Sequence, residues 1–140
     1  MNEQKPLIYV IDDDSDSLEI ASRILEKGGL RVLGFSDPAD ALKEMETRIP
    51  DMIVSDLMMD SLHSGFAFSN QVKSDEKTKH VPIVMMTAAG GALGFDFGPR
   101  GSEDLKAMNV DAFFNKPLRS EPFLAKIWEL LSRSRTERGG

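Results

Sequence analysis

Five residues of this sequence belong to types that together carry out phosphoryl chemistry: Asp12, Asp13, Asp56, Thr87 and Lys116. Clustered carboxylates suit a hard divalent cation, and Mg²⁺ is the usual choice when waters and a phosphate complete the octahedron. A carboxylate beside such a metal attacks phosphorus to give an aspartyl phosphate. An ammonium and a hydroxyl nearby offset the charge of the phosphoryl oxygens and hydrogen-bond them. The chemistry requires that the fold bring all five side chains together.

Each of these residues lies at or just past the end of a short apolar run. The runs cover residues 7–11, 52–54, 81–86 and 112–114, and they lead to Asp12, Asp56, Thr87 and Lys116 in that order. Short runs rich in β-branched residues are typical of strands buried on both faces, and such strands belong to parallel sheets. In open α/β sheets ligands bind beyond the carboxyl ends of the strands. Taken singly, each polar residue has a plain reading as a cap or a solvated side chain, but their common position predicts one site.

The elements between these runs predict the fold class. A further strand is expected over residues 30–35, and helical spacing of apolar residues predicts helices between the strands. The expected helices run from Ser15 to the Gly28-Gly29 pair, from Ser36-Asp37-Pro38 to Met45, over residues 66–74 and over residues 120–132. Alternating strands and helices describe a doubly wound α/β domain with a five-stranded parallel sheet and helices on both faces.

Two other stretches have a less regular pattern. Glycines and a proline crowd residues 90–101, which favours a loop there, followed by a short helix that starts at Ser102. In the last helix Trp128 falls on the apolar face, which predicts a core position.

Length and composition limit the class of protein. The chain has 140 residues, which favours one domain, over residues 6–132, with a flexible tail over 133–140. Its 41% hydrophobic and 29% charged residues are the balance of a globular protein, and the net charge of −6 argues against nonspecific binding of nucleic acid. Cysteine is absent, which excludes disulfides and thiolate metal sites. No apolar run reaches membrane-spanning length, and we expect a cytoplasmic location without membrane contact.

The ordered set Asp12-Asp13, Asp56, Thr87-Ala88 and Lys116-Pro117 resembles the receiver domain of bacterial two-component response regulators. The resemblance covers residues 6–132 and implies a flavodoxin-like sheet of strand order 2-1-3-4-5. It implies a phosphoprotein of a phosphorelay, not an enzyme, which takes a phosphoryl group from a sensor histidine kinase or a phosphotransfer protein. A conformational switch would then control a downstream protein target, and no nucleic acid is expected as a partner.

The same resemblance implies a role for each site residue. Asp56 would be the phosphoacceptor, and Asp13 and Asp56 would bind Mg²⁺ together with the backbone carbonyl of Met58. Asp12 would hold the metal through water. Thr87 and Lys116 would contact the phosphoryl group. The switch residues would be Thr87 and Phe113, and the Lys116-Pro117 peptide bond would be cis.

The sequence departs from the family pattern at two places. Asp60 stands where the family usually has a proline, and the glycine that follows comes one residue late, at Gly65. The glycine-rich segment between Thr87 and Lys116 is also longer than usual, so the expected fourth-helix region is atypical. We expect this segment, residues 90–101, to take part in signalling.

Three other functions use similar ingredients. A phosphatase with an aspartyl-phosphate intermediate needs a second acid to activate water and a cap that binds substrate, and neither is evident. A flavodoxin-like cofactor binder needs a glycine-rich phosphate loop after the first strand, where this chain has acids that would repel phosphate. A receiver-like module that binds partners without being phosphorylated remains as the alternative.

Overall fold

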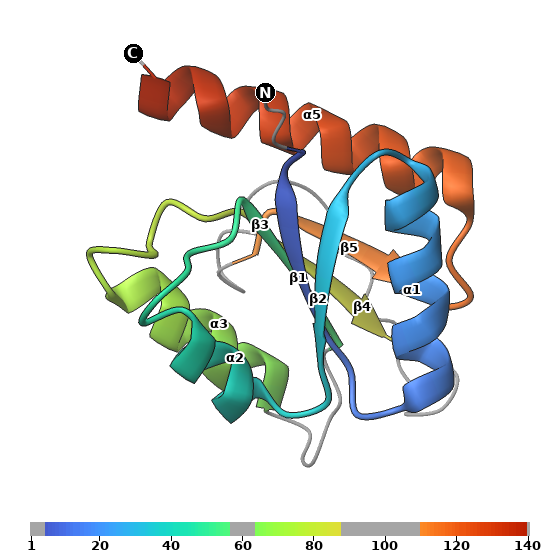
Figure 1. Cartoon of the computed structure of the whole chain (residues 1–140), viewed down its shortest axis with the longest axis horizontal. Coiled ribbons are helices and arrows are strands. Elements are labelled where there is room, and N and C mark those ends of the chain that lie inside the picture. The colour runs from blue at the N-terminus through green and yellow to red at the C-terminus, as the bar shows by residue number, and fades with distance from the viewer. Residues whose placement is uncertain (1–4, 57–63, 88–109, 140) are drawn as a thin grey trace.

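A computed structural model describes residues 5–56, 64–87 and 110–139 of the chain. From β1 to β4 the elements alternate between strands and helices, as predicted (Figure 1). In chain order they are β1 (Leu7–Ile11), α1 (Ser15–Lys27), β2 (Arg31–Phe35), α2 (Pro38–Glu44), β3 (Met52–Asp56), α3 (Ser64–Ser74), β4 (Ile83–Thr87), β5 (Ala112–Asn115) and α5 (Ser120–Gly139). The expected loop over residues 90–101 and the short helix after it lie outside the described residues.

The five strands form one parallel sheet in the order β2-β1-β3-β4-β5, which confirms the predicted topology. Every residue of β1, β3 and β4 is buried. This burial agrees with their nearly continuous apolar sequences, because a strand covered on both faces has no solvent side that favours polar residues. In the register Ile11 pairs with Ser55, Asp56 with Met86 and Thr87 with Asn115. The carboxyl ends of these strands therefore lie side by side.

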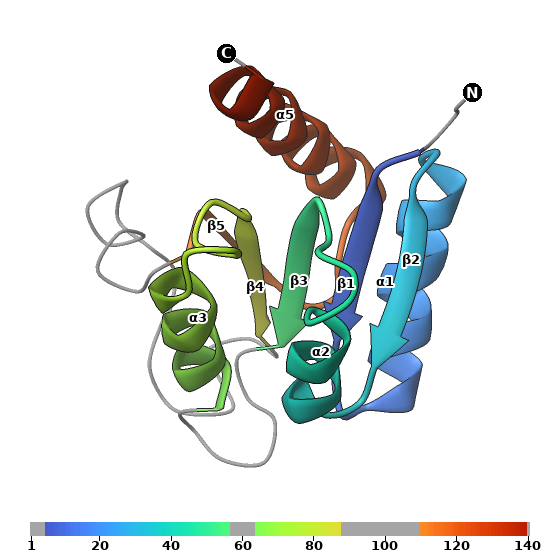
Figure 2. The same ribbon diagram turned by 60° about the vertical axis from the view of Figure 1, so that its left-hand side comes forward.

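Helices cover both faces of the sheet (Figures 1 and 2). On one face, Ala21 and Leu25 of α1 pack with Phe123 and Ile127 of α5 against Val54 and its neighbours. On the other face, Ala41 of α2 and Phe68 and Val72 of α3 pack against the opposite side chains of the same strands. Each fully buried aliphatic or aromatic side chain contributes about 1.5–3 kcal/mol to folding, so these two layers hold the strand ends in place.

The last helix is longer than predicted. It continues from Ser120 to Gly139, whereas the apolar pattern that predicts it stops near Ser132. Residues 132–138 are polar but contain neither glycine nor proline, so the backbone meets no helix breaker before Gly139. The expected flexibility of residues 133–140 stays a prediction. Trp128 is 37% exposed, in contrast to the core position expected for it, because it lies at the margin of the apolar face beside Gly29.

Three charged side chains anchor the amino ends of the strands, at the opposite end of the sheet from the predicted site. Asp51 donates its N–H to the Leu7 carbonyl and accepts the Leu7 N–H on its carboxylate, at 2.8 and 2.7 Å. Lys73 of α3 bonds to the Val81 carbonyl at 2.9 Å and to the Asp111 carboxylate at 3.2 Å. The same Asp111 oxygen accepts the Ile83 N–H at 2.8 Å. These contacts tie α3 to the first residues of β4 and β5.

Among the described residues, no helix combines the length and the apolar character that crossing a bilayer requires.

Candidate functional site

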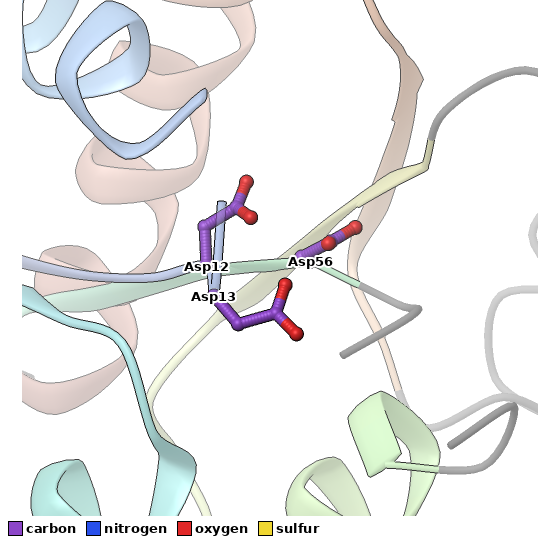
Figure 3. A group of neighbouring side chains, drawn as sticks. All are labelled: Asp12, Asp13 and Asp56. Carbon is purple, nitrogen blue, oxygen red and sulfur yellow. The ribbon is translucent and has the colours of Figure 1, made fainter. Parts of the chain in front are cut away.

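Three carboxylates meet at the carboxyl ends of β1 and β3. Asp12 and Asp13 follow β1 directly, and Asp56 is the last residue of β3 (Figure 3). Each of the three offers one carboxylate oxygen, and these oxygens lie within 4.8 Å of one another. Asp12 and Asp56 are buried, whereas Asp13 is exposed. The site therefore combines two buried acids with one solvent-facing acid, at the ends of two adjacent parallel strands.

Lys116 supplies positive charge to this cluster. Its Nζ lies 2.7 Å from Oδ2 of Asp12 and 3.6 Å from Oδ2 of Asp56. The other oxygen of Asp12 accepts the backbone N–H of Asp14 at 3.0 Å. An ionised carboxylate without solvent is tolerated only when its oxygens have donors, and both oxygens of Asp12 have one. Lys116 thus pairs most closely with Asp12 and stands within reach of Asp56.

The loop after β1 is ordered by the start of α1. Asp14 is the N-cap of this helix, and its carboxylate accepts hydrogen bonds from the backbone N–H and the hydroxyl of Ser17, at 3.3 and 2.8 Å. These bonds stabilise the ionised form, so the Ser17 hydroxyl holds the pKa of Asp14 below its ordinary value. Asp14 caps the helix and is not among the three acids whose oxygens meet in the cluster. This role separates three consecutive acids into two site residues and one cap.

Thr87 and Lys116 are joined through the backbone. The Lys116 N–H donates to the Thr87 carbonyl at 2.7 Å, just past the point where β4 and β5 pair. The Thr87 side chain is buried at the carboxyl end of β4, one residue beyond the partner of Asp56. The Lys116-Pro117 peptide bond is cis, as the family resemblance implied. Phe113 pairs with Met85 and is half-buried against the α2–α3 side of the sheet.

The residues present fit a magnesium ion. Mg²⁺ prefers hard oxygen ligands and is usually held by one or two carboxylates together with several waters. Asp12, Asp13 and Asp56 provide carboxylate oxygens close together, and the exposed Asp13 leaves one side of the group open to water. Met58, whose carbonyl is the fourth expected ligand, lies outside the described residues.

Two features of the site were not expected from the sequence. The first is the capping role of Asp14, for which the signal was present, because an aspartate three residues before a serine at a helix start is a typical capping pattern. The second is that Lys116 lies nearer to Asp12 than to Asp56. No signal in the sequence distinguishes these distances, since they depend on side-chain conformations within a cluster of several acids.

Comparison with known proteins supports the family resemblance found in the sequence. The model of the family "Response regulator receiver domain" matches residues 8–127. The chain is 31% identical over 136 residues to the DNA-binding dual master transcriptional regulator RpaA of Synechocystis, with 92% of this chain and 50% of RpaA covered. It is 32% identical to the response regulator protein TmoT of Ectopseudomonas mendocina, with 91% and 53% covered. The chain thus spans about half the length of these relatives.

Solved structures share the fold. A CheY-like response regulator receiver domain protein from Methanospirillum hungatei superposes with a TM-score of 0.77 at 20% identity, covering 96% of this chain and 99% of that one. The chemotaxis response regulator CheY4 of Vibrio cholerae gives a TM-score of 0.75 at 24% identity, with 91% and 99% covered. At these identities the likeness concerns the fold alone.

Proposed function

The chain belongs to the response regulator receiver domain family, and on that premise we propose that Asp56 is the residue that accepts the phosphoryl group. The observation that carries this proposal is the environment of the three acids. Both oxygens of Asp12 are engaged, one by Lys116 and one by a backbone N–H. Asp13 is the exposed member of the group and lies on a loop. Asp56 is held at the end of a buried strand with an ammonium 3.6 Å away.

Receiver domains take phosphoryl groups from histidine kinases, and the proposed step here follows that rule. A carboxylate oxygen of Asp56 attacks the phosphorus of a phosphohistidine, forming an acyl phosphate. The P–N bond breaks, and its electron pair leaves on the imidazole nitrogen of the donor. The Asp56 side chain thereby changes from a carboxylate with one negative charge to an acyl phosphate, whose charge of roughly −2 lies on the phosphoryl oxygens.

The residues around Asp56 compensate for this charge. Lys116 is within reach of both Asp12 and Asp56, so a small movement of its Nζ brings the ammonium to the transferred phosphoryl oxygens. Mg²⁺, when bound by Asp12, Asp13 and Asp56, supplies positive charge that allows an anionic donor to approach three carboxylates. The Thr87 hydroxyl, at the neighbouring strand end, then donates a hydrogen bond to the phosphoryl group.

The same proposal includes the output of the domain. When Thr87 turns toward the phosphoryl group it leaves space near β5, and Phe113, half-buried on that strand, repacks into it. The hydrogen bond from the Lys116 N–H to the Thr87 carbonyl couples the carboxyl ends of β4 and β5, so that they move together. A downstream protein target then binds the altered surface. The domain acts in the cytoplasm as a stoichiometric acceptor, not as an enzyme with turnover.

The test is phosphorylation with a small donor. The protein is incubated with acetyl phosphate and Mg²⁺, and the intact mass is measured. The wild type should gain one phosphoryl group, and Asp56→Asn should gain none. Asp16→Asn, which makes the same change at an exposed position of α1, is the matched control and should be labelled like the wild type. Full labelling of Asp56→Asn refutes the assignment, and so does a wild type that gains no phosphoryl group.

A further inference from the structure

The outer edge of β2 is an open side of the sheet. β2 is the first strand in the sheet order and pairs only with β1 among the described residues (Figure 2). The Arg31 N–H donates to the Pro6 carbonyl and the Phe35 carbonyl accepts the Asp12 N–H, at 2.9 and 3.0 Å. Both residues therefore direct their peptide groups toward β1. Because the direction alternates along a strand, the peptide groups of Val32 and Gly34 point outward. Such an edge is a template for another strand.

A positively charged cleft lies at the amino end of this edge. Its volume is about 430 Å³, and three cations, one acid and four apolar residues line it. The lining residues are Lys5, Leu7, Glu26, Leu30, Arg31, Val32, Leu33 and Arg48. In a chain with a net charge of −6 this is a local reversal of sign. Arg31 donates its Nε to the Lys5 carbonyl at 2.9 Å. In the part of the chain that the structure describes, no carboxylate lies within ion-pair distance of Arg31.

The carboxyl end of the same strand is acidic. Asp37 follows β2 after one residue, with an extended backbone (φ −137°, ψ 128°), and caps α2. Asp40 lies in the first turn of that helix. The edge strand is therefore cationic at its start and anionic just past its end. An antiparallel copy of the same edge would bring opposite charges together at both ends.

We propose that the partner of this edge is a second copy of the chain, added antiparallel to β2 about a twofold axis at Gly34. In this register the outward peptide groups of Gly34 face each other across the axis. Arg31 of each copy lies opposite Asp37 of the other, and Leu33 lies opposite Phe35. All four residues occupy alternate positions, so they share the face of the sheet that α2 covers. The acidic start of α2 from one copy then reaches the cationic cleft of the other.

Charge selects this register over the alternatives. An antiparallel pairing shifted to place Val32 opposite Gly34 would put Arg31 opposite Phe35 and leave the guanidinium without its acid. A parallel pairing would place Arg31 beside Arg31, which is repulsive, and would not close after two copies. The proposed pairing buries no site residue, because Asp56 lies on β3, two strands from this edge.

The experiment is a charge exchange read by sedimentation equilibrium over a wide range of concentration. The wild type should form a dimer, and Arg31→Asp and Asp37→Arg should each weaken it roughly tenfold or more, since two attractive contacts become repulsive. An equimolar mixture of the two variants should regain the dimer, because each mixed pair restores both contacts. Arg23→Asp, the same charge change at an exposed position of α1, should dimerise like the wild type.

Folding is controlled separately, because Asp37 also caps α2. Asp37→Asn keeps a capping side chain and removes the charge, and circular dichroism reports whether each variant retains its helices. This variant should weaken the dimer less than Asp37→Arg does. Hydrogen exchange of the Val32 and Gly34 amides should slow as protein concentration rises. A wild type that stays monomeric, or a dimer that both charge variants leave unchanged, overturns the proposal.

Discussion

The carboxylate cluster makes the protein less stable without metal, and Asp13→Asn exposes that effect. Three carboxylate oxygens lie within 4.8 Å of one another, and in the described part of the chain the ammonium of Lys116 forms ion pairs with two of these acids, Asp12 and Asp56. At 4.8 Å, two like charges repel by about 1 kcal/mol at the dielectric constant of water and by about 3.5 kcal/mol at an effective value of 20. The positive charge of Lys116 offsets the negative charge of roughly one acid. Asp13 is then repelled by about one remaining negative charge.

Because Asp13 is exposed, solvent screening selects the lower end of this range. In the presence of a chelator, Asp13→Asn should therefore raise the free energy of unfolding by about 1 kcal/mol. With magnesium present, the wild type should instead be more stable than Asp13→Asn. At a concentration of about 100 times its dissociation constant, a ligand that binds only the folded state adds roughly 2.7 kcal/mol. The wild type should gain this amount, and the variant, with one ligand fewer, should gain little.

Urea unfolding measures both free energies, with and without Mg²⁺, in the wild type, in Asp13→Asn and in the control Asp16→Asn. If the free energy of unfolding falls with urea concentration at the same slope in the three proteins, only their stability has changed. The reasoning is wrong if Asp13→Asn is the less stable protein under chelation. It is also wrong if magnesium stabilises the wild type and the variant equally, since the ion then binds without Asp13.

Three further predictions concern other residues. Burial raises the pKa of Tyr9, the only tyrosine of the chain, from 10.0 to about 12, so near-ultraviolet titration of the folded protein should show a late phenolate transition. Because the tyrosine of the unfolded chain loses its proton at a lower pH than that of the folded protein, the free energy of unfolding should fall as the pH rises from 10.0 to about 12, and it should fall less in Tyr9→Phe. A titration midpoint near 10.0 in the folded protein would contradict this prediction. Asp37→Ala removes the α2 cap and should cost about 1 kcal/mol in urea unfolding, whereas Asp37→Asn should cost little. Lys116→Met leaves Asp12 without its ammonium and should cost about 3 kcal/mol, but much less in an Asp12→Asn background; equal costs in both backgrounds would show that the pair contributes nothing.

The sequence was sufficient to predict the sheet and the position of the acids because both depend on strong, local signals. The continuous apolar run of residues 52–54 is typical of a strand buried on both faces, and β3 is such a strand. The extension of α5 to Gly139 was missed because residues 132–138 have no apolar periodicity, and only the lack of a breaker allows the helix to continue. Trp128 was expected in the core because its spacing matches the apolar face, although its place at the margin depends on how α5 lies against Gly29. The pairing of Lys116 with Asp12 depends on side-chain geometry that no linear pattern contains.

The contacts of Lys73 and Asp111 hold the amino ends of β4 and β5 together, and we expect them to limit movement there. Both strands are held at one end by α3 and carry the proposed phosphoryl-contacting residues at the other. When a new contact forms at the carboxyl ends of these strands, we expect the held amino ends to move least. We therefore expect displacement in β4 and β5 to grow along each strand toward Thr87 and Asn115. We therefore expect Asp111 and Lys73 to affect how the domain responds to phosphorylation, although both lie at the opposite end of the strands from the carboxylate cluster.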